Sequence, residues 1–206
     1  VSGLDRYFQI VKSFRDEDLR ADRQPEFTQI DIEMSFADEA LVMDMAEGMV
    51  RTLFKDCLDH ELPDPFPRMT YEQAMRDYGL DKPDVRFDLK LVECTDIFKA
   101  SDFKVFAKAE LVKCLKVEGG EAFTRKEIDE LTEFVKIYGA QGLAWIKVRE
   151  NEWQSPIVKF FSEAEKAAVA ERLAVKPGDI LFFQAGPADM VNTALGYLRG
   201  RMGERM

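Results

Sequence analysis

The side chains best suited to chemistry lie in one charged segment, between Phe14 and Phe27. This segment holds three arginines and five acidic residues within twelve positions. The planar fork of an arginine can grip a phosphate or a carboxylate through two hydrogen bonds. The same composition is also typical of a solvated hairpin loop, whose ions pair with one another for little net energy. The order of the residues and the flanking elements must decide between these interpretations.

The segments on both sides of this loop predict two antiparallel strands. Residues 6–14 and 26–34 are rich in β-branched and aromatic side chains, and residues 15–25 join them. The second strand alternates strictly, so it presents one set of residues on each face. One face carries Phe27, Gln29, Asp31 and Glu33, and the other carries Thr28, Ile30, Ile32 and Met34. A face with two acids and an aromatic ring is typical of the floor of a polar pocket.

Composition excludes several classes of protein. The chain has 206 residues, a net charge of −10, 16 Phe and 9 Met, which indicates a folded, acidic protein of one large or two small domains. No apolar run is long enough to span a membrane, and three scattered cysteines predict neither a disulfide framework nor a zinc site. His60 is the only histidine, so histidine-based triads and multi-histidine metal sites are not expected. We expect a cytoplasmic protein.

The pattern of the rest of the chain predicts an α+β fold. Helices are expected from Ser35 or Asp38 to about Asp59, and at residues 70–78, 124–138, 162–173 and 187–201, with strands at residues 111–117, 142–148 and 180–184. We place a domain boundary near residue 86. Residues 1–86 then form part of an antiparallel sheet with helices, and residues 87–206 form an α+β domain with a mixed sheet.

The order of residues in the charged segment resembles a known motif. Phe-Arg-Asp-Glu, a loop, then Pro-Glu-Phe-Thr-Gln-Ile-Asp, from Phe14 to Asp31, is similar to motif 2 of the class II aminoacyl-tRNA synthetases. Its core, Asp-Glu-Asp-Leu-Arg-Ala-Asp-Arg-Gln-Pro-Glu-Phe, resembles the bacterial-type aspartyl-tRNA synthetases rather than the lysyl and asparaginyl relatives. Residues 124–129, 134–140, 142–148 and 155–157 resemble the domain inserted between motifs 2 and 3 of these enzymes. The resemblance spans the whole chain and implies a fragment from motif 2 through this insertion domain.

The resemblance implies an aspartate–tRNA ligase. Such an enzyme activates L-aspartate with ATP to aspartyl-adenylate and transfers it to the 3′ end of tRNA. The implied partners are ATP, L-aspartate, the acceptor stem of tRNA(Asp) and a second copy of the full-length enzyme, with Mg²⁺ held by residues outside this chain. Membrane association is not implied. The fragment alone is expected to be inactive, because the motif 1, motif 3 and anticodon-binding parts lie elsewhere.

The resemblance also assigns roles to individual residues. It implies that Arg15 is catalytic and contacts the α-phosphate and the aspartyl carboxylate, and that Phe27 stacks on adenine. Gln24 and Glu17 would approach the nucleotide, and Asp31 would hold the substrate ammonium. Asp31 lies about 13 Å beyond Phe27 along the strand, close to the length of an adenosine with its α-phosphate.

Three further assignments concern the loop. Asp16 is counted with the ATP-binding residues and can brace Arg15. Arg20 and Arg23 at the loop tip, with Glu17, are expected to meet the acceptor end of tRNA.

Two other functions stay open from the sequence. The inserted domain type also occurs in subunits of tRNA-dependent amidotransferases, which would make the chain a tRNA-binding module. A synthetase paralogue that does not charge tRNA is the other alternative. The motif 2 hairpin discriminates against the first, because an amidotransferase subunit has no use for it.

Overall fold

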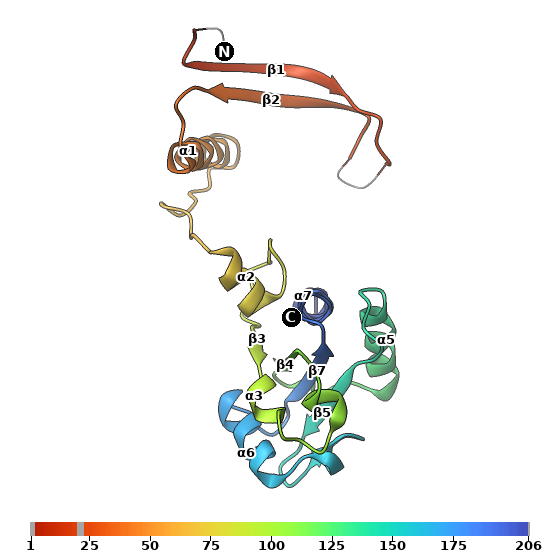
Figure 1. The fold of residues 1–206 in the computed structure, drawn as a ribbon. Coiled ribbons are helices and arrows are strands. Elements are labelled where there is room, and N and C mark those ends of the chain that lie inside the picture. Colours follow the sequence, from red (N-terminus) through yellow and green to blue (C-terminus); the bar gives the residue numbers. More distant parts are fainter. Residues whose placement is uncertain (1–2, 20–22, 206) are drawn as a thin grey trace. The chain divides into compact units, whose positions relative to one another are not determined.

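A computed structural model of the chain describes residues 3–19 and 23–205 (Figure 1). It divides the chain into two compact units, residues 1–68 and residues 69–206. Each unit has its own helices and strands.

The first unit contains a hairpin and a long helix. Strands β1 (Arg6–Phe14) and β2 (Glu26–Met34) pair antiparallel, from Arg6 opposite Met34 to Phe14 opposite Glu26. The strand bounds predicted from alternation are confirmed. Helix α1 (Glu39–Leu58) follows, and the Asp38 side chain caps it by accepting a hydrogen bond of 2.8 Å from the backbone N–H of Leu41. The cap is therefore Asp38 rather than Ser35.

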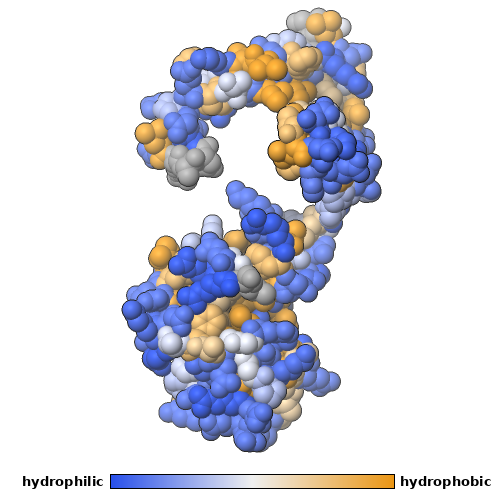
Figure 2. Space-filling model, turned by 180° about the vertical axis from the view of Figure 1, so that it is seen from behind, coloured by the Kyte–Doolittle hydropathy of each residue, from blue (hydrophilic) through white to orange (hydrophobic). Residues whose placement is uncertain are grey.

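The two faces of the hairpin differ in character as the alternation predicted. Phe8, Ile10 and Ile30 lie on the apolar face and are between 49% and 71% exposed. Hydrophobic surface runs along the hairpin in Figure 2. Two strands cannot bury a hydrophobic face between themselves, and no hydrophobic side chain of the described first unit is fully buried. The apolar face of the hairpin therefore stays exposed in the described first unit.

The second unit is a three-layer domain built on one sheet. Its strands are β3 (Leu91–Glu93), β4 (Leu111–Val117), β5 (Ala144–Val148), β6 (Trp153–Gln154) and β7 (Ile180–Gly186). Its helices are α2 (Tyr71–Tyr78), α3 (Thr95–Phe98), α4 (Lys104–Ala107), α5 (Arg125–Lys136), α6 (Glu163–Arg172) and α7 (Ala188–Gly203), with 3-10 turns η1 (Gly120–Ala122) and η2 (Val158–Phe160). Side chains of α5 and α7 pack on one face of the sheet, and those of α3, α4 and α6 pack on the other. The α+β class is confirmed.

The strand order corrects the predicted mixed sheet. The order is β3-β4-β7-β5-β6, and every pair of neighbours that the structure describes is antiparallel. A strand, a helix and a second strand that follow one another, as β4, α5 and β5 do, often give parallel neighbours. However, β7 enters between β4 and β5 and runs antiparallel to both, so these two strands are parallel without touching. This arrangement is a split βαβ unit.

Capping residues fix the helix starts of the second unit. Thr124 with Glu127 and Ser162 with Glu165 form capping boxes at the starts of α5 and α6, where the sequence predicted helices to begin. Pro187 occupies the N-cap of α7, one position earlier than its predicted place in the first turn. Short elements such as α3 and α4 were not predicted, because four residues are too few to show a helical period.

Helix α2 packs with the second unit, whereas the sequence placed the change of domain near residue 86. Gly79, at its C-terminal end, has a φ of +76°, and a Cβ there would lie 2.3 Å from the carbonyl oxygen of Asn192 in α7. Lys113 of β4 reaches the same place, donating 2.9 Å hydrogen bonds to the carbonyls of Met75 and Arg76 and a 2.7 Å bond to Asn192 Oδ1. By packing, residues 69–86 therefore join the second unit. No helix in the described part of the chain is long and apolar enough to cross a bilayer.

Candidate functional site

The charged loop is closed at its base by the backbone. The N–H of Arg15 donates to the carbonyl of Pro25 over 2.9 Å, one step beyond the last paired residues of the hairpin. This bond brings Arg15 opposite the start of β2. The guanidinium carbon of Arg15 lies 5.2 Å from the centre of the Phe27 ring. The two residues that the sequence singled out most strongly therefore lie on the same side of the hairpin.

A pocket of about 400 Å³ opens at this position. Its lining residues are Arg15, Glu17, Arg23, Gln24, Glu26 and Phe27. An ion pair of 3.8 Å joins Arg23 Nη1 to Glu17 Oε2 across the loop. The pocket thus combines two guanidinium groups, two carboxylates, an aromatic ring and a carboxamide.

The guanidinium groups and the aromatic ring suit an anionic ligand that also has a flat ring. An aromatic face such as that of Phe27 stacks any planar group, a guanidinium or a purine. The exposed Arg15 side chain can bind phosphate or carboxylate oxygens. The ion pair of Arg23 is long and solvent-exposed, so Arg23 can exchange Glu17 for another anion at little cost in free energy.

Beyond the pocket, the same face of the hairpin carries a row of polar side chains. Gln9 Nε2 donates a hydrogen bond of 2.9 Å to Asp31 Oδ2, and Ser13 Oγ donates one of 3.1 Å to Gln29 Oε1. Gln9, Ser13, Gln29 and Asp31 are all half-buried. Asp31 does not line the pocket but continues the face that begins at Phe27.

Two other residues were predicted for the site, Asp16 and Arg20. Asp16 is exposed and does not line the pocket, and among the described residues it makes no hydrogen bond or ion pair. Arg20 lies outside the described residues. Glu26 was not predicted, although it lines the pocket and pairs with Lys12 Nζ at 2.6 Å. Its position beside Phe27 at the strand start was the available signal, and alternation concealed it by assigning Glu26 to the opposite face.

Within residues 3–19 and 23–205, no three His, Cys, Asp or Glu side chains lie close enough together to hold a metal ion. His60 is exposed, with its ring 6.5 Å from that of Phe54.

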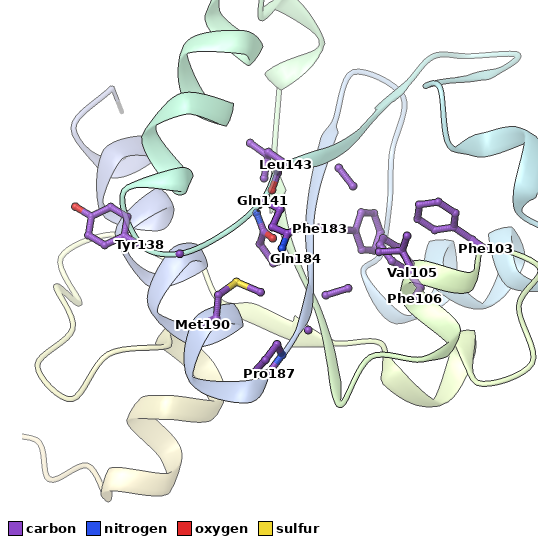
Figure 3. A pocket seen from close by; sticks show the side chains of 15 residues that line it. Phe103, Val105, Phe106, Tyr138, Gln141, Leu143, Phe183, Gln184, Pro187 and Met190 are labelled. Carbon is purple, nitrogen blue, oxygen red and sulfur yellow. Dashed lines mark hydrogen bonds between the residues drawn. The ribbon is translucent and has the colours of Figure 1, made fainter.

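The second unit contains a larger cavity, of about 790 Å³, at the end of β7 (Figure 3). Phe103 and Phe106 lie on one side of the strand, and Tyr138 and Met190 lie on the other. The described lining includes no charged side chain, and its buried Gln184 already donates to the carbonyl of Gly142 over 2.7 Å. The cavity therefore offers little for catalysis.

The buried thiols of the second unit are likewise unreactive. Burial raises the pKa of Cys94 to about 12 and raises the pKa of Cys114 well above its ordinary value. A thiol must ionise to act as a nucleophile or a metal ligand. Neither residue is suited to either role.

Comparison with known proteins links these features. A family model described as "tRNA synthetases class II (D, K and N)" matches residues 1–177. The chain is 66% identical over 206 residues to the Aspartate–tRNA(Asp/Asn) ligase of Nitratidesulfovibrio vulgaris, 62% identical over 205 residues to that of Oleidesulfovibrio alaskensis and 54% identical over 209 residues to that of Aquifex aeolicus. Each match covers all of this chain but 34% of the relative. The chain thus spans about a third of the length of these curated relatives.

Proposed function

Because the chain belongs to the class II tRNA synthetases (D, K and N), we propose that it supplies the motif 2 part of the active site, and the inserted domain, of an aspartate–tRNA ligase. The observation that carries the proposal is the pocket on the hairpin, where the Arg15 guanidinium lies 5.2 Å from the Phe27 ring centre. That pairing suits a nucleotide phosphate beside a stacked base. A tRNA-binding amidotransferase module would have no use for it.

The reaction proceeds in two displacements. A carboxylate oxygen of L-aspartate bonds to the α-phosphorus of ATP while the bond to the bridging oxygen breaks, and pyrophosphate leaves with that electron pair. A ribose hydroxyl at the 3′ end of tRNA then attacks the new carbonyl carbon. It loses its proton, and AMP leaves with the electrons of the acyl–oxygen bond.

Arg15 acts in the first displacement. Its guanidinium can contact an α-phosphate oxygen and an aspartate carboxylate oxygen together, which neutralises two anions that would otherwise repel each other. Its fixed positive charge also stabilises the charge that spreads over the phosphoryl oxygens in the transition state. Loss of one such contact costs about 3 kcal/mol of transition-state stabilisation.

The other pocket residues bind the substrates. Phe27 stacks on the adenine, Gln24 and Glu17 contact the nucleotide, and Asp31 pairs with the ammonium group of aspartate. Asp16 remains a candidate for bracing Arg15. A carboxylate about 13 Å along the strand from the stacking ring meets the amino-acid end of an aspartyl-adenylate.

The tRNA end of the site lies in the loop. Arg23 can release Glu17 and bind an acceptor-stem phosphate, which leaves Glu17 free to face the terminal nucleotides of tRNA(Asp). Arg20, which belongs to the same loop by sequence, is a further candidate to bind an acceptor-stem phosphate. In the full-length enzyme, a cytoplasmic homodimer, Mg²⁺ would be held by residues outside this chain.

Aspartate-dependent exchange of pyrophosphate into ATP tests the proposal on the full-length polypeptide that contains this chain. Arg15→Ala should lower the exchange rate roughly a hundredfold. Arg201→Ala, on the surface of α7 and paired with Glu204 at 3.0 Å, is the matched control and should leave the rate unchanged. No exchange in the unmodified enzyme, or equal rates for both variants, would overturn the proposal.

A further inference from the structure

One hydrogen bond on the polar face of the hairpin joins the two strands by their side chains. Gln9 of β1 stands directly opposite Asp31 of β2, and its carboxamide Nε2 donates to Asp31 Oδ2 over 2.9 Å. Both side chains are half-buried. The backbone ladder already pairs the strands from end to end, so this bond adds an orientation of the carboxylate rather than the pairing itself.

The bond leaves one oxygen of the carboxylate available. Among the described residues Asp31 makes no other side-chain hydrogen bond and no ion pair, so Oδ1 is free while Oδ2 is held by Gln9. A carboxylate with one oxygen fixed presents the other in a defined direction. It can then receive a cation without first losing rotamer freedom.

Because Gln9 is uncharged, it can orient the carboxylate of Asp31 without repelling a cation that binds there. A lysine or arginine at position 9 would also donate to Asp31, but its positive charge would repel an incoming ammonium group. Lys12, the neighbouring cation of β1, lies on the opposite face and pairs with Glu26 at 2.6 Å. The carboxylate of Asp31 is thus oriented without being neutralised.

We propose that Gln9 is a positioning residue that orients Asp31 to bind the ammonium group of the amino-acid substrate. This inference rests on the proposed function, because it takes Asp31 as the ammonium ligand. Gln9 itself touches neither the substrate nor the reacting atoms.

Steady-state pyrophosphate exchange with the full-length enzyme tests the proposal, with the Michaelis constants for aspartate and ATP measured separately. Gln9→Met keeps the length of the side chain and removes the donor. It should raise the KM for aspartate roughly tenfold, because a hydrogen bond to a charged group is lost, while the KM for ATP changes less than about twofold. Thr28→Val, on the opposite face of the hairpin, is the matched control and should change neither constant.

Two further variants separate positioning from a merely structural role. Gln9→Lys retains a donor and should preserve the melting temperature, yet it should raise the KM for aspartate because it neutralises Asp31. In an Asp31→Ala background, Gln9→Met should have no additional effect on that constant, since the residue through which Gln9 acts is gone.

The possible outcomes distinguish the inference from the function on which it rests. An unchanged aspartate KM in Gln9→Met and Gln9→Lys, or an equal rise in the ATP constant, would overturn the inference while exchange by the unmodified enzyme upholds the proposed function. If Gln9→Met does not fold, Gln9→Lys alone decides: a raised KM for aspartate supports the inference, and an unchanged KM overturns it. Absence of exchange in the unmodified enzyme would overturn both.

Discussion

Replacing the buried Lys113 by methionine should destabilise the second unit more than the same replacement of an exposed lysine does. The side chain is 3% exposed, and its ammonium group donates to the carbonyls of Met75 and Arg76 and to Asn192 Oδ1 at 2.7–2.9 Å. It therefore ties the last turn of α2 to β4 and α7. Burial lowers the pKa of Lys113, so the desolvation of its charge offsets part of this gain.

The magnitude follows from the acceptors left behind. Methionine fills nearly the same volume, so no cavity forms. The carbonyl of Arg76 belongs to an exposed residue and can bind water, whereas Asn192 is 9% exposed and its amide oxygen would lose its partner inside the protein. An unsatisfied buried acceptor costs about 1–3 kcal/mol, and with the loosening of α2 we expect a loss of about 2–4 kcal/mol.

Urea unfolding followed by tryptophan fluorescence measures this loss selectively. Both tryptophans, Trp145 and Trp153, lie in the second unit, so the signal reports its unfolding alone. Lys126→Met is the matched control, because Lys126 is an exposed residue of α5 that pairs with Glu130 at 3.8 Å and should contribute less than about 0.5 kcal/mol. Equal effects of the two substitutions would refute the assignment of Lys113 as a structural tie.

Two further predictions concern charge and thiol chemistry in the second unit. The Arg172 guanidinium hydrogen-bonds Asp96 and lowers the pKa of this carboxyl to about 2, so the pair stabilises the fold above pH 4 and its contribution disappears as the pH falls from 4 to 2. In urea titrations at pH 6, Arg172→Gln should therefore be less stable than the unmodified chain, by less than about 1 kcal/mol because the pair is exposed. The difference in the free energy of unfolding should vanish near pH 2. A difference independent of pH would contradict this prediction. A thiol-reactive maleimide should label the exposed Cys57 within minutes and leave Cys94 unlabelled in the native state, as mass spectrometry of tryptic peptides would show, and equal labelling would contradict the burial of Cys94.

Local signals in the sequence predicted the elements that position the candidate site. Strict alternation between Phe27 and Met34 set the faces of β2, and the capping boxes at Thr124 and Ser162 set the first residues of two helices. Each signal is contained within a few residues, so it needs no knowledge of the tertiary fold.

The features that were wrong or missed depend on contacts between distant segments. The insertion of β7 between β4 and β5 pairs Ala144 with Phe183, a contact that no local pattern encodes. In the sequence, Lys113 cannot be told from any other polar residue in a strand. It is buried only because α2 and α7 pack against β4 and accept its hydrogen bonds. Glu26 was missed because alternation assigns its side chain to the opposite face, where it pairs with Lys12, although the residue lines the pocket at the start of β2.

The central claim is that a guanidinium and a phenyl ring on one face of the hairpin together hold the nucleotide part of aspartyl-adenylate. Calorimetric binding of a non-hydrolysable aspartyl-adenylate analogue to the full-length enzyme tests it most directly, with Phe27→Leu compared with Phe14→Leu. Phe14 lies on the opposite face and is 71% exposed in this chain. We predict that Phe27→Leu weakens binding roughly tenfold or more through lost stacking, while Phe14→Leu changes it less than about twofold. Equal affinities of the two variants would contradict the account.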